Sequence, residues 1–201
     1  MNIQAKKNNL SSKDLINISI FTLLFAICMF LVAGIAGMIP AGFVFHGAIA
    51  AIPCGIIYMY IRAKTPKKGS IIVQSILFAI IYFVMGNPIS IPISILLGGV
   101  LAEIISSTGK YISFWRNTIG FALVTVITWL GFMFNMMFQK QYYMEYATGR
   151  GSSAAYVEKL LNLANGPMFY AAIVVTVICA FLGAILGRKL LKKHFMKAGM
   201  V

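Results

Sequence analysis

The chain has 201 residues, of which 60% are hydrophobic and only 10% are charged, and its formal net charge is +13. A water-soluble domain needs a more highly charged surface than this composition supplies, so a soluble enzyme or soluble binding module is excluded. The sequence predicts an all-α integral membrane protein whose single domain takes up residues 1–201.

Six apolar segments have roughly the length of helices that cross a hydrocarbon core of about 30 Å. They cover residues 15–38, 42–62, 70–86, 88–106, 118–138 and 168–188. The third and fourth are separated only by MGNPIS, in which Gly86, Asn87 and Pro88 are typical of a turn. These two segments are therefore predicted to form a helical hairpin.

The basic residues are distributed unevenly between the predicted loops. All but three of the 17 Lys and Arg residues lie before the first segment, after the second, after the fourth or after the sixth. The exceptions are Lys140, Arg150 and Lys159, in the long loop 139–167. By the positive-inside rule, both termini are predicted to be cytoplasmic and the long loop extracellular. Orientation and attraction to anionic lipid headgroups then explain the positive charge, and no nucleic-acid partner is expected.

Motifs for catalysis, nucleotide hydrolysis and metal binding are missing from the sequence. It contains no phosphate-binding loop, no H-E-x-x-H and no G-x-S-x-G, so we expect neither enzyme activity nor a cofactor or metal. Cys28, Cys54 and Cys179 lie in separate apolar segments, where packing is their expected role. Glu103 is the single acidic residue within the apolar segments, too little for the relay of a proton-coupled or sodium-coupled carrier. The chain is expected to bind a substrate and to depend on a partner for energy.

Polar and aromatic side chains recur along one face of the fifth segment. They are three or four residues apart, which is the spacing of a helical face. The members are Thr125, Thr128, Phe132, Asn135 and Gln139, with Trp129 close to the same face. Asn162, Asn165 and Phe169 follow a similar spacing at the start of the sixth segment.

The long loop between these segments contains four tyrosines and the flexible stretch TGRGSS. The tyrosines are Tyr142, Tyr143, Tyr146 and Tyr156. Such a loop predicts a lid over an outward-facing pocket with aromatic walls and amide groups, suited to a small planar heterocycle. The predicted substrate-binding residues are Asn135, Gln139, Trp129, Asn87, Tyr142, Tyr143, Asn165 and His46. Alternatively, the tyrosines form an interfacial belt and the amides bond neighbouring helices.

Small residues recur at short spacings in the sixth and first segments. They are Ala180, Gly183, Ala184 and Gly187 in the sixth and Ser19, Thr22 and Ala26 in the first. Small side chains let another helix approach closely within a membrane. The pattern therefore indicates either a surface for a membrane partner or packing between helices of the same bundle.

The stretch KKGSIIVQSILFAIIYFVMGNPISIPISILLGGVLAEII, within this six-segment pattern, resembles the substrate-binding S component of an energy-coupling factor (ECF) vitamin transporter. The GNP turn followed by a glycine-rich segment ending in LAE is similar to S components for thiamine precursors. The opening LSSKDLINISIFT is similar to a related branch known from streptococci and treponemes. The resemblance spans nearly the whole chain.

The resemblance implies a multi-pass protein of the bacterial cell membrane that captures a vitamin or vitamin precursor outside the cell. Such a protein docks on a transmembrane coupling protein driven by two cytoplasmic ATPases and topples in the membrane to release its cargo inside. The implied substrate is a small hydroxymethylated nitrogen heterocycle, and hydroxymethylpyrimidine and pyridoxine both fit this description.

The resemblance also implies a surface for the coupling protein. Where the family has A-x-x-x-A in the first segment, this chain has Ser19, Thr22, Leu23 and Ala26. The full set of expected interface residues adds Ala180, Ala184 and Glu103. Glu103 lies about 22 Å along a helix from Pro88, at 1.5 Å per residue, and so near the cytoplasmic boundary. A carboxylate there needs a partner, expected to be Lys110, Arg116 or a basic residue at the end of another segment.

Two other classes of function are compatible with the sequence. A stand-alone carrier or channel would move its substrate without ATPase partners. A membrane scaffold or regulator would bind no small molecule at all. Uptake in cells that lack the coupling module separates the first class from an S component, and ligand screening by thermal shift separates the second.

Overall fold

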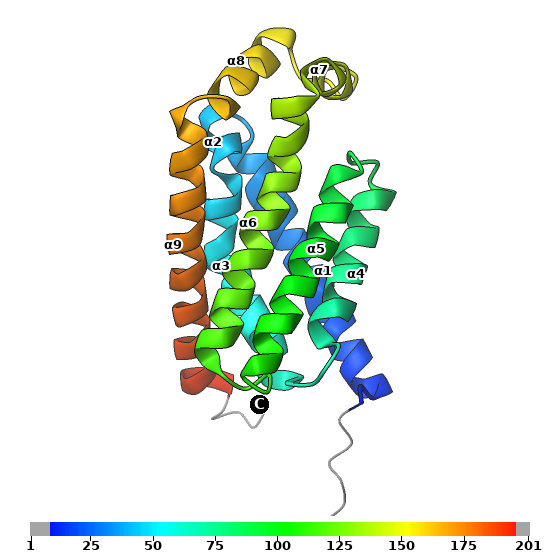
Figure 1. The fold of residues 1–201 in the computed structure, drawn as a ribbon, viewed down its shortest axis with the longest axis vertical. Helices are drawn as coiled ribbons and strands as arrows, with labels where there is room; N and C mark the ends of the chain where they lie inside the picture. Colours follow the sequence, from blue (N-terminus) through cyan, green and yellow to red (C-terminus); the bar gives the residue numbers. More distant parts are fainter. Residues whose placement is uncertain (1–8, 196–201) are drawn as a thin grey trace, which may run out of the picture.

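The computed structural model describes residues 9–195, and this part of the chain is helical with short connections (Figure 1). The long helices are α1 (Ser12–Ala36), α3 (His46–Lys64), α4 (Ser70–Val84), α5 (Ser90–Thr108), α6 (Phe114–Phe138) and α9 (Pro167–Leu190). The short helices are α2 (Pro40–Val44), α7 (Lys140–Thr148) and α8 (Ala154–Ala164), and a π-helical turn, Leu191–Phe195, follows α9. The long helices run along the bundle, and α7 and α8 lie across one end of it (Figure 1).

Four segments of the described chain have the length and mean hydropathy of membrane-spanning helices. They are Ser12–Ala36, Ser90–Thr108, Phe114–Phe138 and Pro167–Lys193. These helices support the membrane character of the chain, while the six-span arrangement with cytoplasmic termini stays a prediction. Helix α4 is apolar but has only 15 residues.

The predicted second segment, 42–62, differs most from a simple spanning helix. It is divided at Phe45 into the one-turn α2 and the longer α3. Most of α3 is buried within the bundle, and its composition is correspondingly rich in Ala and Gly with polar residues at both ends. A helix that contacts protein on most sides does not need a lipid-facing apolar surface, which explains its lower hydropathy.

Helices α3 and α9 approach each other closely at glycine residues. A Cβ atom at Gly55 would lie 2.7 Å from the carbonyl carbon of Gly183, and one at Gly183 would lie 2.7 Å from the carbonyl oxygen of Ile52. Backbone atoms cannot move aside cheaply, so both positions require the absence of a side chain. Ala180 and Ala184 lie in the same contact and are fully buried.

This burial corrects part of the predicted coupling-protein surface. Ala180 and Ala184 are buried in the core on α9, and Thr22 and Ala26 are 1% exposed on α1. The alternative reading of the small residues, packing within the bundle, holds for these four. Ser19 and Leu23 are exposed on α1, so they are available to a partner.

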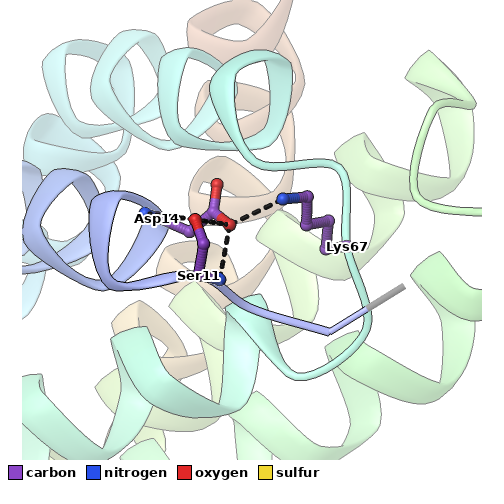
Figure 2. Close-up of polar contacts among 3 residues, drawn as sticks. All are labelled: Ser11, Asp14 and Lys67. Carbon is purple, nitrogen blue, oxygen red and sulfur yellow. Dashed lines mark hydrogen bonds and ion pairs between the residues drawn. The ribbon is translucent and has the colours of Figure 1, made fainter. Parts of the chain in front are cut away.

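The start of α1 is fixed to the connection between α3 and α4 by one carboxylate. Asp14 accepts hydrogen bonds at 2.7 Å from both the backbone N–H and the hydroxyl of Ser11, while its own N–H donates back to the Ser11 hydroxyl (Figure 2). Lys67 forms an ion pair with the same carboxylate at 2.6 Å (Figure 2). The capping box thus holds Asp14 in the position where it anchors the α3–α4 connection.

Glu103 has different partners from those predicted. Its carboxylate accepts the backbone N–H groups of Gly69 at 2.6 Å and Ile71 at 3.2 Å, at the start of α4. Among the described residues the one ion pair is Lys67–Asp14, so the expected pairing of Glu103 with Lys110 or Arg116 is wrong. The first N–H groups of a helix lack intrahelical partners and carry partial positive charge, which makes them suitable ligands for a carboxylate.

We expect Gly183→Ala to lower the free energy of unfolding by about 1–3 kcal/mol, because its Cβ would overlap backbone atoms of α3. The measurement is thermal unfolding of the purified protein in detergent. Gly34→Ala is the matched control, since a Cβ at Gly34 on α1 meets nothing within 4 Å. Equal stability of the two variants would contradict the proposed role of the α3–α9 contact.

Candidate functional site

A pocket of about 240 Å³ lies at the end of the bundle covered by α7. Its walls come from α1, α2, α4, the α4–α5 turn, α5, α6, α7 and the turn after α7. Aromatic residues predominate, and the polar groups include the side chains of Asn87, Asn135 and Tyr143. We call this space the outer pocket. It combines apolar ring faces with a few hydrogen-bonding groups, the usual composition of a site for a small organic ligand.

Contacts from α7 and the following turn form the roof of the outer pocket. Arg150 donates from Nη2 to the backbone oxygens of Met85 at 2.9 Å and Gly86 at 2.7 Å. Its guanidinium also lies over the ring of Tyr146, 4.6 Å from the centroid. The hydroxyl of Tyr146 donates to Asn87 Oδ1 at 3.3 Å. Arg150 and Tyr146 therefore attach α7 to the α4–α5 turn.

The α4–α5 turn has the geometry that this attachment requires. Gly86 has a φ of +69°, a conformation that other residues adopt only with strain. Asn87 Nδ2 donates to the backbone oxygen of Tyr82 at 3.2 Å, which directs Oδ1 toward Tyr146. The turn thus presents two carbonyl groups and one amide oxygen to the roof.

Helix α8 is attached separately to the end of α1. The hydroxyl of Tyr156 donates to the backbone oxygen of Gly37. Ser153 caps α8 by accepting the N–H of Tyr156, and Val157, Leu160 and Ala164 are buried against the bundle. The sequence predicted that the loop 139–167 forms a lid. In the structure this segment folds into two short helices, α7 and α8.

Phe132 separates the outer pocket from a second, enclosed cavity. Its ring contacts Tyr82 at a centroid distance of 5.6 Å and His46 at 4.8 Å, and it lines both spaces. The inner cavity lies between α1, α3, α4 and α6, and its free volume of about 10 Å³ is close to the minimum for one water molecule. The inner cavity is therefore too small for a ligand group larger than a water molecule.

The inner cavity is lined by two buried polar groups that have no partner among the described residues. His46 Nδ1 must carry a proton, because it lies 2.6 Å from the carbonyl oxygen of Phe43, which can only accept. In the neutral ring Nε2 is then an acceptor, and it is unbonded. The hydroxyl of Thr128 is also unbonded. A buried group of this kind costs about 1–3 kcal/mol unless a water or ligand satisfies it.

The tyrosine hydroxyls of the roof stay protonated. Burial, with the nearby Tyr156 and Tyr146 hydroxyls, raises the pKa of Tyr143 well above its usual value. Burial also raises the pKa of Tyr146, although Arg150 acts in the opposite direction. Both side chains therefore act as neutral donors and acceptors at physiological pH.

The structure brings five of the predicted substrate-binding residues to these two spaces. Asn87, Asn135 and Tyr143 line the outer pocket, and His46 and Trp129 line the inner cavity. Asn135 donates to the hydroxyl of Ser90 at 2.6 Å, so one of its amide hydrogens is already used. Trp129 donates from Nε1 to the backbone oxygen of Val44 at 2.8 Å and packs against Phe169, so it acts as a fixed wall.

The other three predicted residues lie outside both spaces. Gln139 is exposed and lines a separate groove of about 420 Å³ between α5 and α6, which Asn135 also lines. Tyr142 is 47% exposed and stacks on Tyr146 from outside. Asn165 terminates α8 and donates to the backbone oxygens of Leu161 and Met136. Helix α6 ends at Phe138, so Gln139 does not continue the polar face of that helix.

Arg150 is the charged residue of the outer pocket, and the sequence analysis did not select it. The sequence contained an indication of its importance, because Arg150 is one of three basic residues in a loop that is predicted to be extracellular. Its partners are backbone oxygens, and a backbone oxygen leaves no mark in the sequence. Phe43 and Tyr82 were also missed, because they reach the pocket from α2 and α4, outside the polar face of the fifth apolar segment.

A family model described as a hypothetical bacterial integral membrane protein (Trep_Strep) matches residues 12–197. The chain belongs to this family. Membership agrees with the four apolar helices in showing a membrane-embedded, multi-pass protein. Comparisons with curated proteins and with solved structures give no match.

In this Trep_Strep protein we expect Arg150→Gln to loosen the roof, because two hydrogen bonds from a charged donor are lost. Hydrogen exchange of 140–152 should become roughly tenfold faster. Arg116→Gln, at the other end of the bundle, should leave this segment unchanged. Unaltered exchange of 140–152 in Arg150→Gln would show that other contacts hold α7.

Proposed function

We propose that this Trep_Strep protein is the substrate-binding S component of an ECF-type importer in the bacterial cell membrane. It captures a small water-soluble vitamin or vitamin precursor from outside and delivers it inward when docked on a transmembrane coupling protein powered by two ATPases. In this proposal the chain crosses the membrane six times, both termini are cytoplasmic, and the outer pocket faces the exterior. The similarity to S components described from the sequence supports this assignment.

The observation that carries the proposal is the roofed outer pocket. It lies at the end of the bundle opposite to the start of α1 and the end of α9, where Arg188, Lys189 and other basic residues gather. The positive-inside rule places that basic end in the cytoplasm and the pocket outside. A pocket under a lid on the outer face suits a protein that first captures a scarce solute.

The dimensions and polarity of the pocket favour a single-ring heterocycle. Its volume of about 240 Å³ is below the range typical of sites for drug-sized ligands. The tyrosines are neutral, and the hydrogen bonds of Arg150 go to backbone carbonyl groups of the roof, so most of the groups that the pocket offers to a ligand are neutral donors and acceptors. Hydroxymethylpyrimidine and pyridoxine fit these conditions, because both combine a small aromatic ring with hydroxymethyl and ring-nitrogen groups.

The proposed docking surface for the coupling protein is the exposed face of α1. Leu23 is 55% exposed and Ser19 lies one turn before it, and both belong to a lipid-facing surface with several large apolar side chains. A helix–helix contact in a membrane depends on close packing. Helix α9 contributes less to this surface than the sequence predicted, because its small residues contact α3.

Isothermal titration of the purified protein with hydroxymethylpyrimidine, thiamine and pyridoxine tests ligand binding. We expect one of them to bind, and Tyr143→Phe to weaken that binding about tenfold by loss of one hydrogen bond. Tyr142→Phe is the matched control, because the neighbouring Tyr142 lies outside the pocket. Equal effects of the two substitutions would exclude the outer pocket as the binding site.

Uptake of the bound ligand tests the dependence on ATPases. We expect cells that express the chain together with an ECF coupling protein and its two ATPases to accumulate labelled ligand. Cells that express the chain alone should accumulate none above background, and a Walker A lysine substitution in the ATPases should abolish uptake. Accumulation by the chain alone would instead identify a stand-alone carrier.

A further inference from the structure

A second pocket lies at the opposite end of the bundle from the outer pocket. It has a volume of about 370 Å³ and is formed by the end of α3, the α5–α6 connection, the start of α6 and the end of α9. We call it the basic pocket, because Arg62, Arg188 and Lys192 all line it. The proposed vitamin site does not involve this pocket.

Within residues 9–195, the cations of the basic pocket have no carboxylate partner in its lining. The chain has four acidic side chains, and none of them lines the pocket. Asp14 is paired with Lys67, and Glu145 and Glu158 lie on α7 and α8 at the other end of the bundle. Glu103 acts electrostatically on Arg62, but its oxygens are bonded to backbone N–H groups of α4. The positive charge of the pocket is therefore not neutralised by a carboxylate of its own lining.

Arg62 is only 2% exposed and is held in place by the start of α4. It donates from Nη1 to the hydroxyl of Ser70 at 2.7 Å and from Nη2 to Gln74 Oε1 at 2.9 Å. Its Nε–H is buried and has no partner among the described residues. A buried guanidinium N–H without an acceptor is costly, and an anionic oxygen is the acceptor that a guanidinium binds most strongly.

Asn117 provides an independent unsatisfied group in the same pocket. It is 5% exposed, and its Nδ2 donates to the backbone oxygen of Tyr111 at 2.9 Å. The other end of the amide, Oδ1, is buried and has no partner in the described chain. An amide oxygen accepts and cannot donate, so the group that satisfies it must carry an N–H or O–H.

Arg188 and the apolar part of the lining complete the site. The guanidinium of Arg188 lies over the ring of Phe114, 4.5 Å from the centroid. Its N–H groups have no hydrogen-bond or ion-pair partner among the described residues and are available to an anion. Met59, Ile112 and Leu191 supply apolar surface beside the cations. A ligand with a charged head and a short carbon backbone matches this combination.

We propose that the basic pocket binds a phosphate group whose organic substituent carries a hydrogen-bond donor. The phosphate oxygens contact Arg188 and Lys192 at the pocket surface. Small shifts of the lining side chains bring the Nε–H of Arg62 to the phosphate and Asn117 Oδ1 to the hydroxyl or ammonium group of the substituent, because both atoms lie just beneath that surface. Glycerol phosphate and ethanolamine phosphate have this chemistry. Each occurs as the headgroup of a membrane lipid and as a small soluble ester.

The binding test uses the purified full chain in detergent, with thermal shift and native mass spectrometry as readouts. The probes are short-chain phosphatidylglycerol, phosphatidylethanolamine and phosphatidylcholine, together with soluble glycerol 3-phosphate. We expect phosphatidylglycerol or phosphatidylethanolamine to bind at least tenfold more tightly than phosphatidylcholine, whose headgroup has a phosphate but no N–H or O–H donor. Equal binding of all three lipids would overturn the proposal.

The variant Arg188→Gln/Lys192→Gln should weaken binding about tenfold, since it removes two cations from the pocket. Lys189→Gln/Lys193→Gln is the matched control, because it removes the same charge from exposed positions of the same helix end that do not line the pocket. Equal losses in both variants would indicate non-specific attraction to anions and contradict a defined site.

Glycerol 3-phosphate distinguishes the two sources of the ligand. If glycerol 3-phosphate stabilises the protein as much as phosphatidylglycerol does, and Arg188→Gln/Lys192→Gln loses this stabilisation, the pocket is a site for soluble phosphate esters. If only the lipid stabilises the protein, and the same variant loses this stabilisation, the pocket is a site for a lipid headgroup. Failure of every probe to bind would reject the proposal.

Discussion

The close contact between α3 and α9 is the constraint on which the rest of the bundle depends. Apolar side chains gain nothing by leaving lipid for protein, so helices in a membrane associate through packing at short distance. Gly55 and Gly183 allow the two backbones to meet, and α3 is thereby buried in the bundle. Because α3 is buried along its length, its polar residues face protein cavities: His46 at one end and Arg62 at the other.

The two ends of the bundle are fixed by interactions of different strength. At the end with the termini, Asp14 is bonded to Ser11 and Lys67, and Glu103 to two N–H groups of α4. These are charge-assisted contacts in partly buried surroundings, and they hold the helix ends rigidly. At the other end, the hydrogen bonds of Arg150 are charge-assisted as well, but this side chain is exposed, so water competes for its carbonyl partners. The polar attachment of α7 is therefore more exposed to solvent than the contacts at the opposite end.

Part of the candidate site was predictable because it lies on a single element or at a turn with strong local chemistry. Asn87 follows from the GNP turn, and Asn135 and Trp129 follow from the polar and aromatic spacing of the fifth apolar segment. The helical spacing did not predict the position of Gln139 correctly, because α6 ends at Phe138, one residue before it. Periodicity describes one helix, and it does not report where that helix ends or which element covers it.

The sequence by itself determined that this is a helical membrane protein, since a chain with so few charges and such long apolar segments has no stable alternative in water. It also determined the hairpin turn and the accumulation of basic residues at one end. Only the tertiary structure decided which small residues face another helix of the same bundle, and that Glu103 binds backbone N–H groups instead of a cation. The physical reason is that both outcomes depend on contacts with backbone atoms of distant segments. Backbone atoms are the same in every residue, so the sequence does not show where such contacts form.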